Sequence, residues 1–177
     1  MAELDIVDEE DKVIGKADFE EIHKKGLRHR SVQIFVFDKP NLENLLIAQR
    51  SSKQETSKLK LHPSAGGHVK LGQSYLRSAQ EELKEELFYE YRELPTGVTL
   101  VEIARYKNDS RPTNKENTCL FFSIYSGPFS IDEAEIKRIY WENINNTWEN
   151  MRRNQDDYTF TFLNAMKEFR RFRGLLK

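Results

Sequence analysis

The chain has 177 residues, of which 38% are hydrophobic and 32% charged, and its formal net charge is -1. This length and composition fit a single domain over residues 1–177, and the near-zero charge excludes a protein devoted to coating nucleic acid or an anionic membrane. No apolar run approaches the roughly 20 residues that cross a bilayer, and the polar start lacks the regions of a signal peptide, so we expect a cytoplasmic protein.

The first residues predict a hairpin, a short helix and a pair of strands. Two apolar-containing runs, 4–7 and 12–16, flank an acidic turn, which is typical of a small N-terminal β-hairpin. One or two helical turns are expected over 18–24. The run 31–37 (SVQIFVF) alternates and is rich in β-branched and aromatic residues, so it predicts a half-buried strand, with 45–49 as its hairpin partner.

An amphipathic helix is predicted over residues 74–88, with Ser74 as its N-cap. Before it come a polar, lysine-rich loop at 51–60 and a glycine-containing segment. Helical spacing places four apolar side chains on one stripe that packs on a core: Leu76, Ala79, Leu83 and Leu87.

Three carboxylates of this helix are spaced as metal ligands. Glu82, Glu85 and Glu86 stand at i, i+3 and i+4, so one helical face presents all of them to a single ion. Closely packed oxygen ligands suit Mg²⁺ or Mn²⁺, and these ions suit phosphate chemistry. The alternative is an ordinary solvated helix, but such a helix would not require the adjoining glycines Gly66 and Gly67.

The second half of the chain predicts three strands and then helices. Strand patterns cover 98–106 and 118–125, a weaker one covers 136–141, and one or two helices are expected over 143–151 and 158–173. Strands interleaved with helices indicate an α+β fold, an α/β/α sandwich in which helices enclose a mixed β-sheet and an N-terminal β-hairpin is added.

The segment 66–89 resembles the Nudix box, G-x5-E-x7-R-E-U-x-E-E-x-G-U, in which U is a bulky apolar residue. The first glycine and the E-U-x-E-E run are present as Gly67, Glu82, Leu83, Glu85 and Glu86. The resemblance implies a metal-dependent hydrolase of a diphosphate linkage in a nucleoside diphosphate derivative or a related metabolite. It implies that the three glutamates hold Mg²⁺ or Mn²⁺, that Glu82 and Glu85 are catalytic, and that Glu82 is the base or its closest helper.

Three positions depart from the box, because Gln73 replaces its first glutamate, Glu81 its arginine and Phe88 its second glycine. In the family the arginine helps to orient the glutamates, so Glu81 is expected to add negative charge to an uncompensated cluster and to raise carboxylate pKa values. Phe88 is expected to change the helix exit, since a left-handed terminus is costly for phenylalanine. These departures motivate a second hypothesis, a catalytically weak Nudix domain that binds a nucleotide or a protein partner.

Outside the box, the runs HKKGLRHRSVQIFVF and HPSAGGHV resemble the Nudix branch that includes isopentenyl-diphosphate isomerase. In the isomerase, histidines and glutamates surround a metal, and the nearest equivalents here are His23, His29 and His68. Of these, His29 and His68 are candidate metal ligands, with Glu116 as a further candidate. The alternative is that these histidines only hydrogen-bond the backbone.

The thiol of the isomerase is absent, because Gly66 stands where its Cys-Gly-His segment has the cysteine. The single cysteine, Cys119, lies in an apolar run and is expected to be buried. The second acid of the isomerase also lacks a clean match, since Asn117 takes its register and Glu116 is adjacent. Isomerase activity is therefore the third hypothesis.

Substrate contacts are expected from the loop before the helix. Gly66 and Gly67 would let the backbone approach phosphates, and Gly72 would fix the loop. Arg50 and Lys60 would meet the phosphates, although exposed lysines are common for other reasons. The expected partner is a small-molecule diphosphate, with neither nucleic acid nor membrane, and a homodimer is left open.

Overall fold

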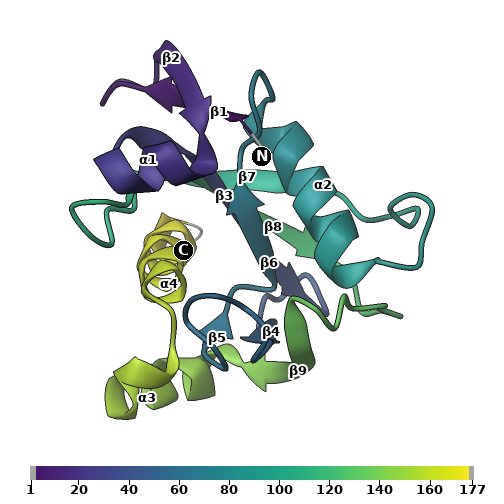
Figure 1. Ribbon diagram of the computed structural model, residues 1–177. Coiled ribbons are helices and arrows are strands. Elements are labelled where there is room, and N and C mark those ends of the chain that lie inside the picture. The colour runs from purple at the N-terminus through teal and green to yellow at the C-terminus, as the bar shows by residue number, and fades with distance from the viewer. Residues whose placement is uncertain (1–2, 176–177) are drawn as a thin grey trace.

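The computed structural model describes residues 3–175, which form an α/β/α sandwich (Figure 1). A seven-stranded mixed sheet lies between α2 (Tyr75–Leu87) on one face and α4 (Phe160–Leu175) on the other. The predicted α+β sandwich is therefore confirmed.

The N-terminal hairpin also forms as predicted. Its strands are β1 (Glu3–Val7) and β2 (Val13–Asp18), which pair antiparallel. The next element is α1 (Phe19–Lys25), which begins where the Asp18 carboxylate accepts a hydrogen bond from the Glu21 N–H at 2.8 Å. This cap satisfies one of the free N–H groups of the first turn.

The centre of the sheet is β3 (Arg28–Phe37). It pairs parallel with β8 (Lys115–Ile124) and antiparallel with β6 (Ala65–His68). On the other side of β8 lies the edge strand β7 (Val101–Lys107). The parallel pair makes the sheet mixed, as predicted.

The predicted hairpin partner of 31–37 is β4 (Asn44–Arg50), but it pairs with β3 only at Phe37 and Leu45. Most of β4 pairs instead with β9 (Ile136–Asn143), and its end pairs with β5 (Leu61–His62). The predicted hairpin is therefore confirmed only at its turn end, because β6 occupies the rest of that edge of β3.

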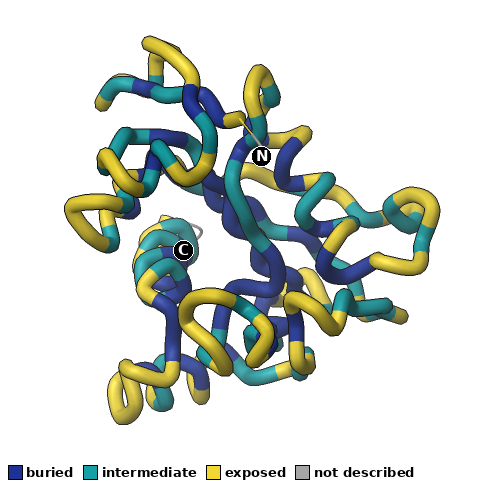
Figure 2. The backbone as a smooth tube through the Cα atoms, viewed as in Figure 1, coloured by how far each residue is buried: buried dark blue, intermediate teal, exposed yellow. Residues whose placement is uncertain are grey.

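Side chains of β3 alternate between the two faces of the sheet, as a period of two requires. Val32, Ile34 and Val36 pack into the core beneath α2, whereas Phe35 and Phe37 pack beneath α4. Figure 2 shows the central strands buried and the connecting loops exposed. The sheet therefore has a separate apolar core on each face, one beneath α2 and one beneath α4.

The buried stripe of α2 differs from the prediction at one position. Ala79, Leu83 and Leu87 are buried, but Leu76 is 45% exposed and Tyr75 is buried instead. Steps of four residues back from Leu87 lead to position 75, so position 76 is rotated by about 100° away from the core. The predicted cap is confirmed, since the Ser74 Oγ accepts a hydrogen bond from the Arg77 N–H.

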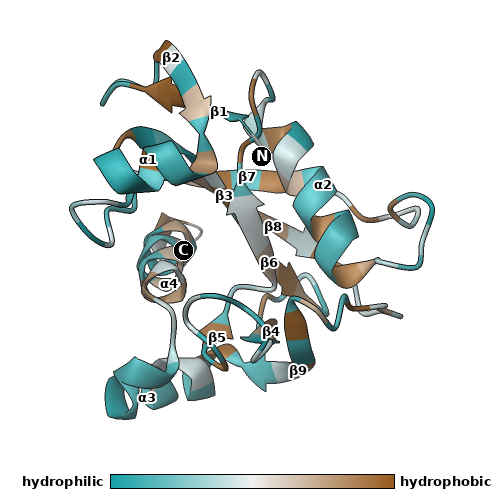
Figure 3. Cartoon of the chain, viewed as in Figure 1, coloured by the Kyte–Doolittle hydropathy of each residue, from teal (hydrophilic) through white to brown (hydrophobic). Residues whose placement is uncertain are grey.

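The chain ends with α3 (Ile144–Arg153), the 3-10 turn Gln155–Asp157 and α4. Figure 3 shows α1 and α3 as largely hydrophilic, which fits their position at the periphery. Over residues 3–175, no helix combines the length and apolar character that crossing a bilayer requires.

Candidate metal centre

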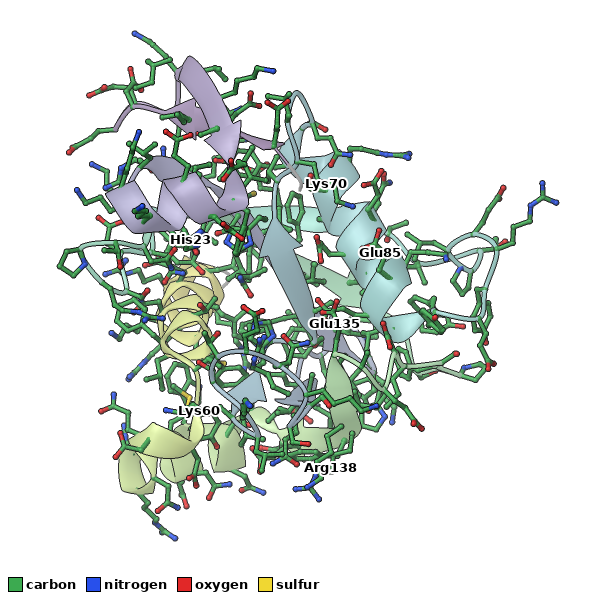
Figure 4. All side chains as sticks on the ribbon, in the orientation of Figure 1. His23, Lys60, Lys70, Glu85, Glu135 and Arg138 are labelled. Atoms are coloured by element: carbon green, nitrogen blue, oxygen red, sulfur yellow. The ribbon has the colours of Figure 1, made fainter. Side chains whose placement is uncertain are left out.

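The carboxylates of α2 lie against β6. Glu86 is buried, and its Oε1 accepts a hydrogen bond from the Gly66 N–H at 3.0 Å. Glu82 is half-buried and Glu85 is exposed on the outer side of the helix (Figure 4). Three carboxylates that differ in burial but share one helix face can supply oxygen ligands to one divalent cation.

Both glycines at the start of the box lie where a side chain would collide with a neighbour. A Cβ on Gly67 would stand 2.4 Å from the Glu82 carboxylate, and a Cβ on Gly66 would stand 2.5 Å from Gln33 Oε1 and 2.7 Å from Val32 O. The glycine at 67 therefore makes room for Glu82, a contact that the sequence did not indicate.

The electrostatics of these carboxylates call for a cation. Burial, and then the charge of Glu85, raise the pKa of Glu82 to about 7. Burial, and then the charge of Glu82, raise the pKa of Glu86 well above its ordinary value. Neighbouring buried carboxyl groups ionise less readily because their negative charges repel each other. A bound divalent ion stabilises the ionised form, so this donor set fits Mg²⁺ or Mn²⁺.

These raised pKa values predict how the stability of the metal-free protein depends on pH. A carboxyl whose pKa is raised to about 7 in the folded state adds stability that is fully present below about pH 4.5 and is lost as pH rises through 7. We expect Glu82 to lower the free energy of unfolding in EDTA by on the order of 2 kcal/mol between pH 5 and pH 8. The lowered pKa values of His29 and His62 act in the opposite direction, but equally in wild type and in Glu82→Gln, so the difference between the two proteins reports on Glu82. Urea denaturation of the wild type and of Glu82→Gln measures this contribution.

The variant Glu82→Gln should show a smaller fall over the same pH range, and added Mg²⁺ should flatten the wild-type profile. The variant retains part of the fall because the raised pKa of Glu86 acts in the same direction. Identical profiles for the two proteins would contradict the assignment.

Glu81, which replaces the arginine of the box, is not uncompensated. Its carboxylate accepts hydrogen bonds from Gln73 Nε2 at 3.0 Å and Arg77 Nε at 2.7 Å, and Lys70 Nζ lies 3.4 Å away. The Gln73 hydrogen bond is the main reason that the pKa of Glu81 is lowered. The carboxylate pKa values of Glu82 and Glu86 are raised as expected, but burial and the charges of Glu82, Glu85 and Glu135 are the causes, not Glu81.

Phe88 ends the helix without a left-handed residue, as expected. Its φ is -131°, and its buried ring packs against Tyr91, Tyr125 and Phe129. The replacement of glycine therefore adds an aromatic contact to the core beneath α2.

Glu135 is a fourth carboxylate near the cluster that the sequence did not indicate. It precedes β9, and Figure 4 places it near the C-terminal half of α2. Burial raises its pKa, and its charge in turn contributes to the raised pKa values of Glu82 and Glu86. Its sequence context, IDEAEIKR, contains several acids, and no spacing marks the one that faces α2.

Arg50 lies on the same side of the sheet as the glutamates. Its guanidinium donates to Gln54 Oε1 at 2.7 Å and to the Thr56 carbonyl, while the charges of Glu86 and Glu135 counteract the lowering of its pKa by burial. The structure therefore brings Arg50 near the carboxylates and holds it there through the loop at 51–60.

Two other residues predicted to contact the substrate, Lys60 and Gly72, do not contact the carboxylates of α2. Lys60 lines a hollow of about 480 Å³ with Arg138 and Tyr140, away from α2 (Figure 4). Gly72 has a φ of +71°, and its N–H donates to Asp5 Oδ2 at 2.9 Å, so it joins the box loop to the N-terminal hairpin.

The opposite face of the sheet carries a histidine cluster made of His23, His29 and His68. Their ligand atoms lie within 4.8 Å of one another. The Nδ1 atoms of His23 and His29 contact backbone carbonyls at 2.9 and 3.0 Å, and a carbonyl only accepts, so each Nδ1 carries the proton. The Nε2 lone pair of each of these rings is therefore free for a ligand.

Two buried nitrogens of this cluster have no hydrogen-bond partner among residues 3–175, namely Nε2 of His29 and of His68. Burial, and then the charge of His68, lower the pKa of His29 to about 4, so this imidazole is neutral at pH 7. Backbone hydrogen bonding explains Nδ1 of His29 but leaves its Nε2 unexplained. The donor set fits a metal that accepts imidazole.

Glu116 completes this cluster. Its Oε1 lies 3.7 Å from His68 Nε2 and 3.9 Å from His29 Nε2. Burial raises the pKa of Glu116, but His68, His29 and Asn114 outweigh it and hold the pKa at about 2. Residues 29 and 116 are paired in the parallel β3–β8 register, so Glu116, and not Asn117, shares the face of the histidines.

Comparison with known proteins identifies the family of this chain. Residues 27–163 match the NUDIX domain family. An uncharacterised Nudix hydrolase of Yersinia pestis is 31% identical over 143 residues, which cover 78% of this chain and 71% of the relative. An isopentenyl-diphosphate Delta-isomerase of Serratia proteamaculans is 28% identical over 165 residues, which cover 93% and 89%. The crystal structure of DR0079 from Deinococcus radiodurans has a similar fold, with a TM-score of 0.70 at 21% identity over 84% of this chain and 88% of that one. The chain belongs to the Nudix hydrolase family.

Proposed function

We propose that this protein is a hydrolase that needs Mg²⁺ or Mn²⁺ and cleaves a diphosphate linkage in a nucleoside diphosphate derivative or a related metabolite. The observation that carries the proposal is the contact of two box glutamates with the Gly66–Gly67 backbone, since the Glu82 carboxylate lies against Gly67 and Glu86 accepts a hydrogen bond from the Gly66 N–H. Glu85 follows on the same helix and is exposed. A divalent ion at these carboxylates neutralises phosphate oxygens and lowers the pKa of an attacking water.

The residues of the chain have distinct roles in this reaction. Glu82 accepts the proton of the attacking water, because its half-buried carboxylate lies against the Gly67 backbone, where the phosphates of the substrate would approach. Glu86 is held in place by the Gly66 N–H. Arg50, whose guanidinium lies near the charges of Glu86 and Glu135, supplies positive charge to the substrate phosphates.

The experiment is to measure the release of phosphate or nucleotide from a panel of diphosphates with Mg²⁺ or Mn²⁺. We expect Glu82→Gln and Glu85→Gln to lower kcat/KM, with a loss of about 10² to 10⁴ for Glu82, because a positioned base contributes on that scale. Glu90→Gln, an exposed glutamate just beyond α2, is the matched control and should retain wild-type activity.

Each alternative gives a different result in the same assay. Metal-dependent nucleotide binding without turnover of any substrate would reject the hydrolase and support a catalytically weak binding domain. Conversion of isopentenyl diphosphate to its isomer would instead support isomerase activity. The isopentenyl-diphosphate Delta-isomerase of Serratia proteamaculans is a relative of this chain.

We also propose that His23, His29, His68 and Glu116 bind a transition metal on the other face of the sheet, motivated by the two unpartnered Nε2 atoms. Titration with Zn²⁺ followed by calorimetry should show a site that His68→Ala removes and Glu82→Gln retains. Loss of the same site in both variants would show that the two clusters are not independent, and no loss in His68→Ala would reject this metal site.

A further inference from the structure

Lys70 follows β6 and places its ammonium over the glutamate face of α2. Its Nζ lies 3.3 Å from Glu85 Oε1 and 3.4 Å from Glu81 Oε2. Within residues 3–175, no other cationic side chain forms an ion pair with Glu82, Glu85 or Glu86. Figure 4 shows Lys70 near the beginning of α2 and Glu85 further along the same helix.

The backbone around Lys70 is fixed from both sides. The Val69 N–H donates to the Arg30 carbonyl and the Leu71 N–H donates to the Glu3 carbonyl, each at 3.0 Å. The Cα of Lys70 therefore stays in place, and its ammonium moves only through its own side chain. That side chain is 42% exposed, so it has room to move.

Glu81 anchors the ammonium beside the box. The Glu81 carboxylate is fixed by Gln73 and Arg77, and Gln73 in turn accepts a hydrogen bond from Ser78 Oγ at 2.6 Å. Both departures from the box at 73 and 81 belong to this network. Gln73 holds the Glu81 carboxylate, and Glu81 is a second partner for Lys70. The ammonium therefore keeps one carboxylate when Glu85 binds a metal ion.

An ammonium 3.3 Å from Glu85 Oε1 and a divalent cation on the same carboxylate repel each other, so the two cations compete for Glu85. We propose that Lys70 is a resident counter-ion that the divalent ion displaces from Glu85, and that the displaced ammonium, still held by Glu81, binds a phosphate oxygen of the substrate. This inference rests on the proposed function, since it requires the glutamates to bind the metal.

The alternative is an ordinary surface ion pair, which adds little stability and has no part in ligand binding. That alternative predicts that removal of the Lys70 charge leaves both metal affinity and phosphate affinity unchanged. The two explanations therefore differ in binding measurements that do not depend on turnover.

The experiment compares wild type, Lys70→Met and Lys70→Arg in Mn²⁺ binding, followed by electron paramagnetic resonance, and counts only the site that Glu82→Gln removes. Pyrophosphate binding to the Mn²⁺-loaded proteins is then measured by calorimetry. Lys107→Met is the control, since it removes the same charge from an exposed pair with Glu9. We expect Lys70→Met to bind Mn²⁺ about fivefold to tenfold more tightly and pyrophosphate about tenfold more weakly.

Lys70→Arg and Lys107→Met should stay close to wild type in both measurements. Unchanged Mn²⁺ affinity in Lys70→Met, or unchanged pyrophosphate affinity, would overturn the role of Lys70 while leaving the proposed metal site intact. Absence of any Mn²⁺ site that depends on Glu82 in the wild type would overturn the proposed function and this inference together.

Discussion

Gly67→Ala should fold normally and lose about 10²-fold in metal-dependent hydrolysis, because misplacement of a catalytic group by about 1 Å has effects of that size. The added Cβ would stand 2.4 Å from the Glu82 carboxylate. This carboxylate is the far end of a flexible side chain, so it is pushed aside while the backbone remains in place. Steady-state kinetics and Mn²⁺ binding measure the loss.

Gly15→Ala is the matched control for this variant, since it adds the same methyl group to a strand where the nearest atom is Ile6 Cδ1 at 3.7 Å. Thermal unfolding of both variants should be close to that of wild type. If Gly67→Ala unfolds at a much lower temperature than wild type, its loss of activity reports on folding and not on Glu82. If Gly67→Ala keeps full activity, the reaction does not need Glu82 in its present position.

Gly66→Cys, which restores the isomerase pattern Cys-Gly-His, should not isomerise isopentenyl diphosphate and should lower the free energy of unfolding by about 1–3 kcal/mol, as overpacking does. The new Cβ would stand 2.7 Å from the Val32 carbonyl oxygen, which is backbone, and 2.5 Å from Gln33 Oε1. A thiol at 66 therefore cannot enter without movement of β3. Urea denaturation and an isomerase assay check the two effects.

The double variant Gly66→Cys with Gln33→Ser separates the two collisions. It removes the contact with the Gln33 amide but keeps the one with Val32, so it should recover only part of the lost stability. Isomerase activity in either variant would contradict the expectation that a thiol at position 66 does not restore the isomerase site.

Local patterns predicted most elements of this fold. The alternation of SVQIFVF located β3, the turn residues located the hairpin, and Ser74 located the start of α2. These features depend on neighbours in the chain. The pairing of β4 with β9, in contrast, depends on which strands compete for an edge, and no local pattern encodes that competition.

The same distinction holds for the candidate site. The spacing of Glu82, Glu85 and Glu86 indicates one helical face and hence one metal, because helix geometry is local. The sequence also matched the Nudix box, and the family was confirmed. Glu135 could not be predicted, because its position beside α2 depends on the packing of the segment before β9.

The sequence by itself therefore determined the carboxylate helix, which follows from short-range periodicity, and the fold family, which follows from the resemblance to the Nudix box. Only the tertiary structure decided that Glu116, not Asn117, joins the histidines, because the parallel register of β3 and β8 sets which face each residue takes. It also decided that Glu81 forms an ion pair with Lys70. The two residues come together because the box loop packs against α2.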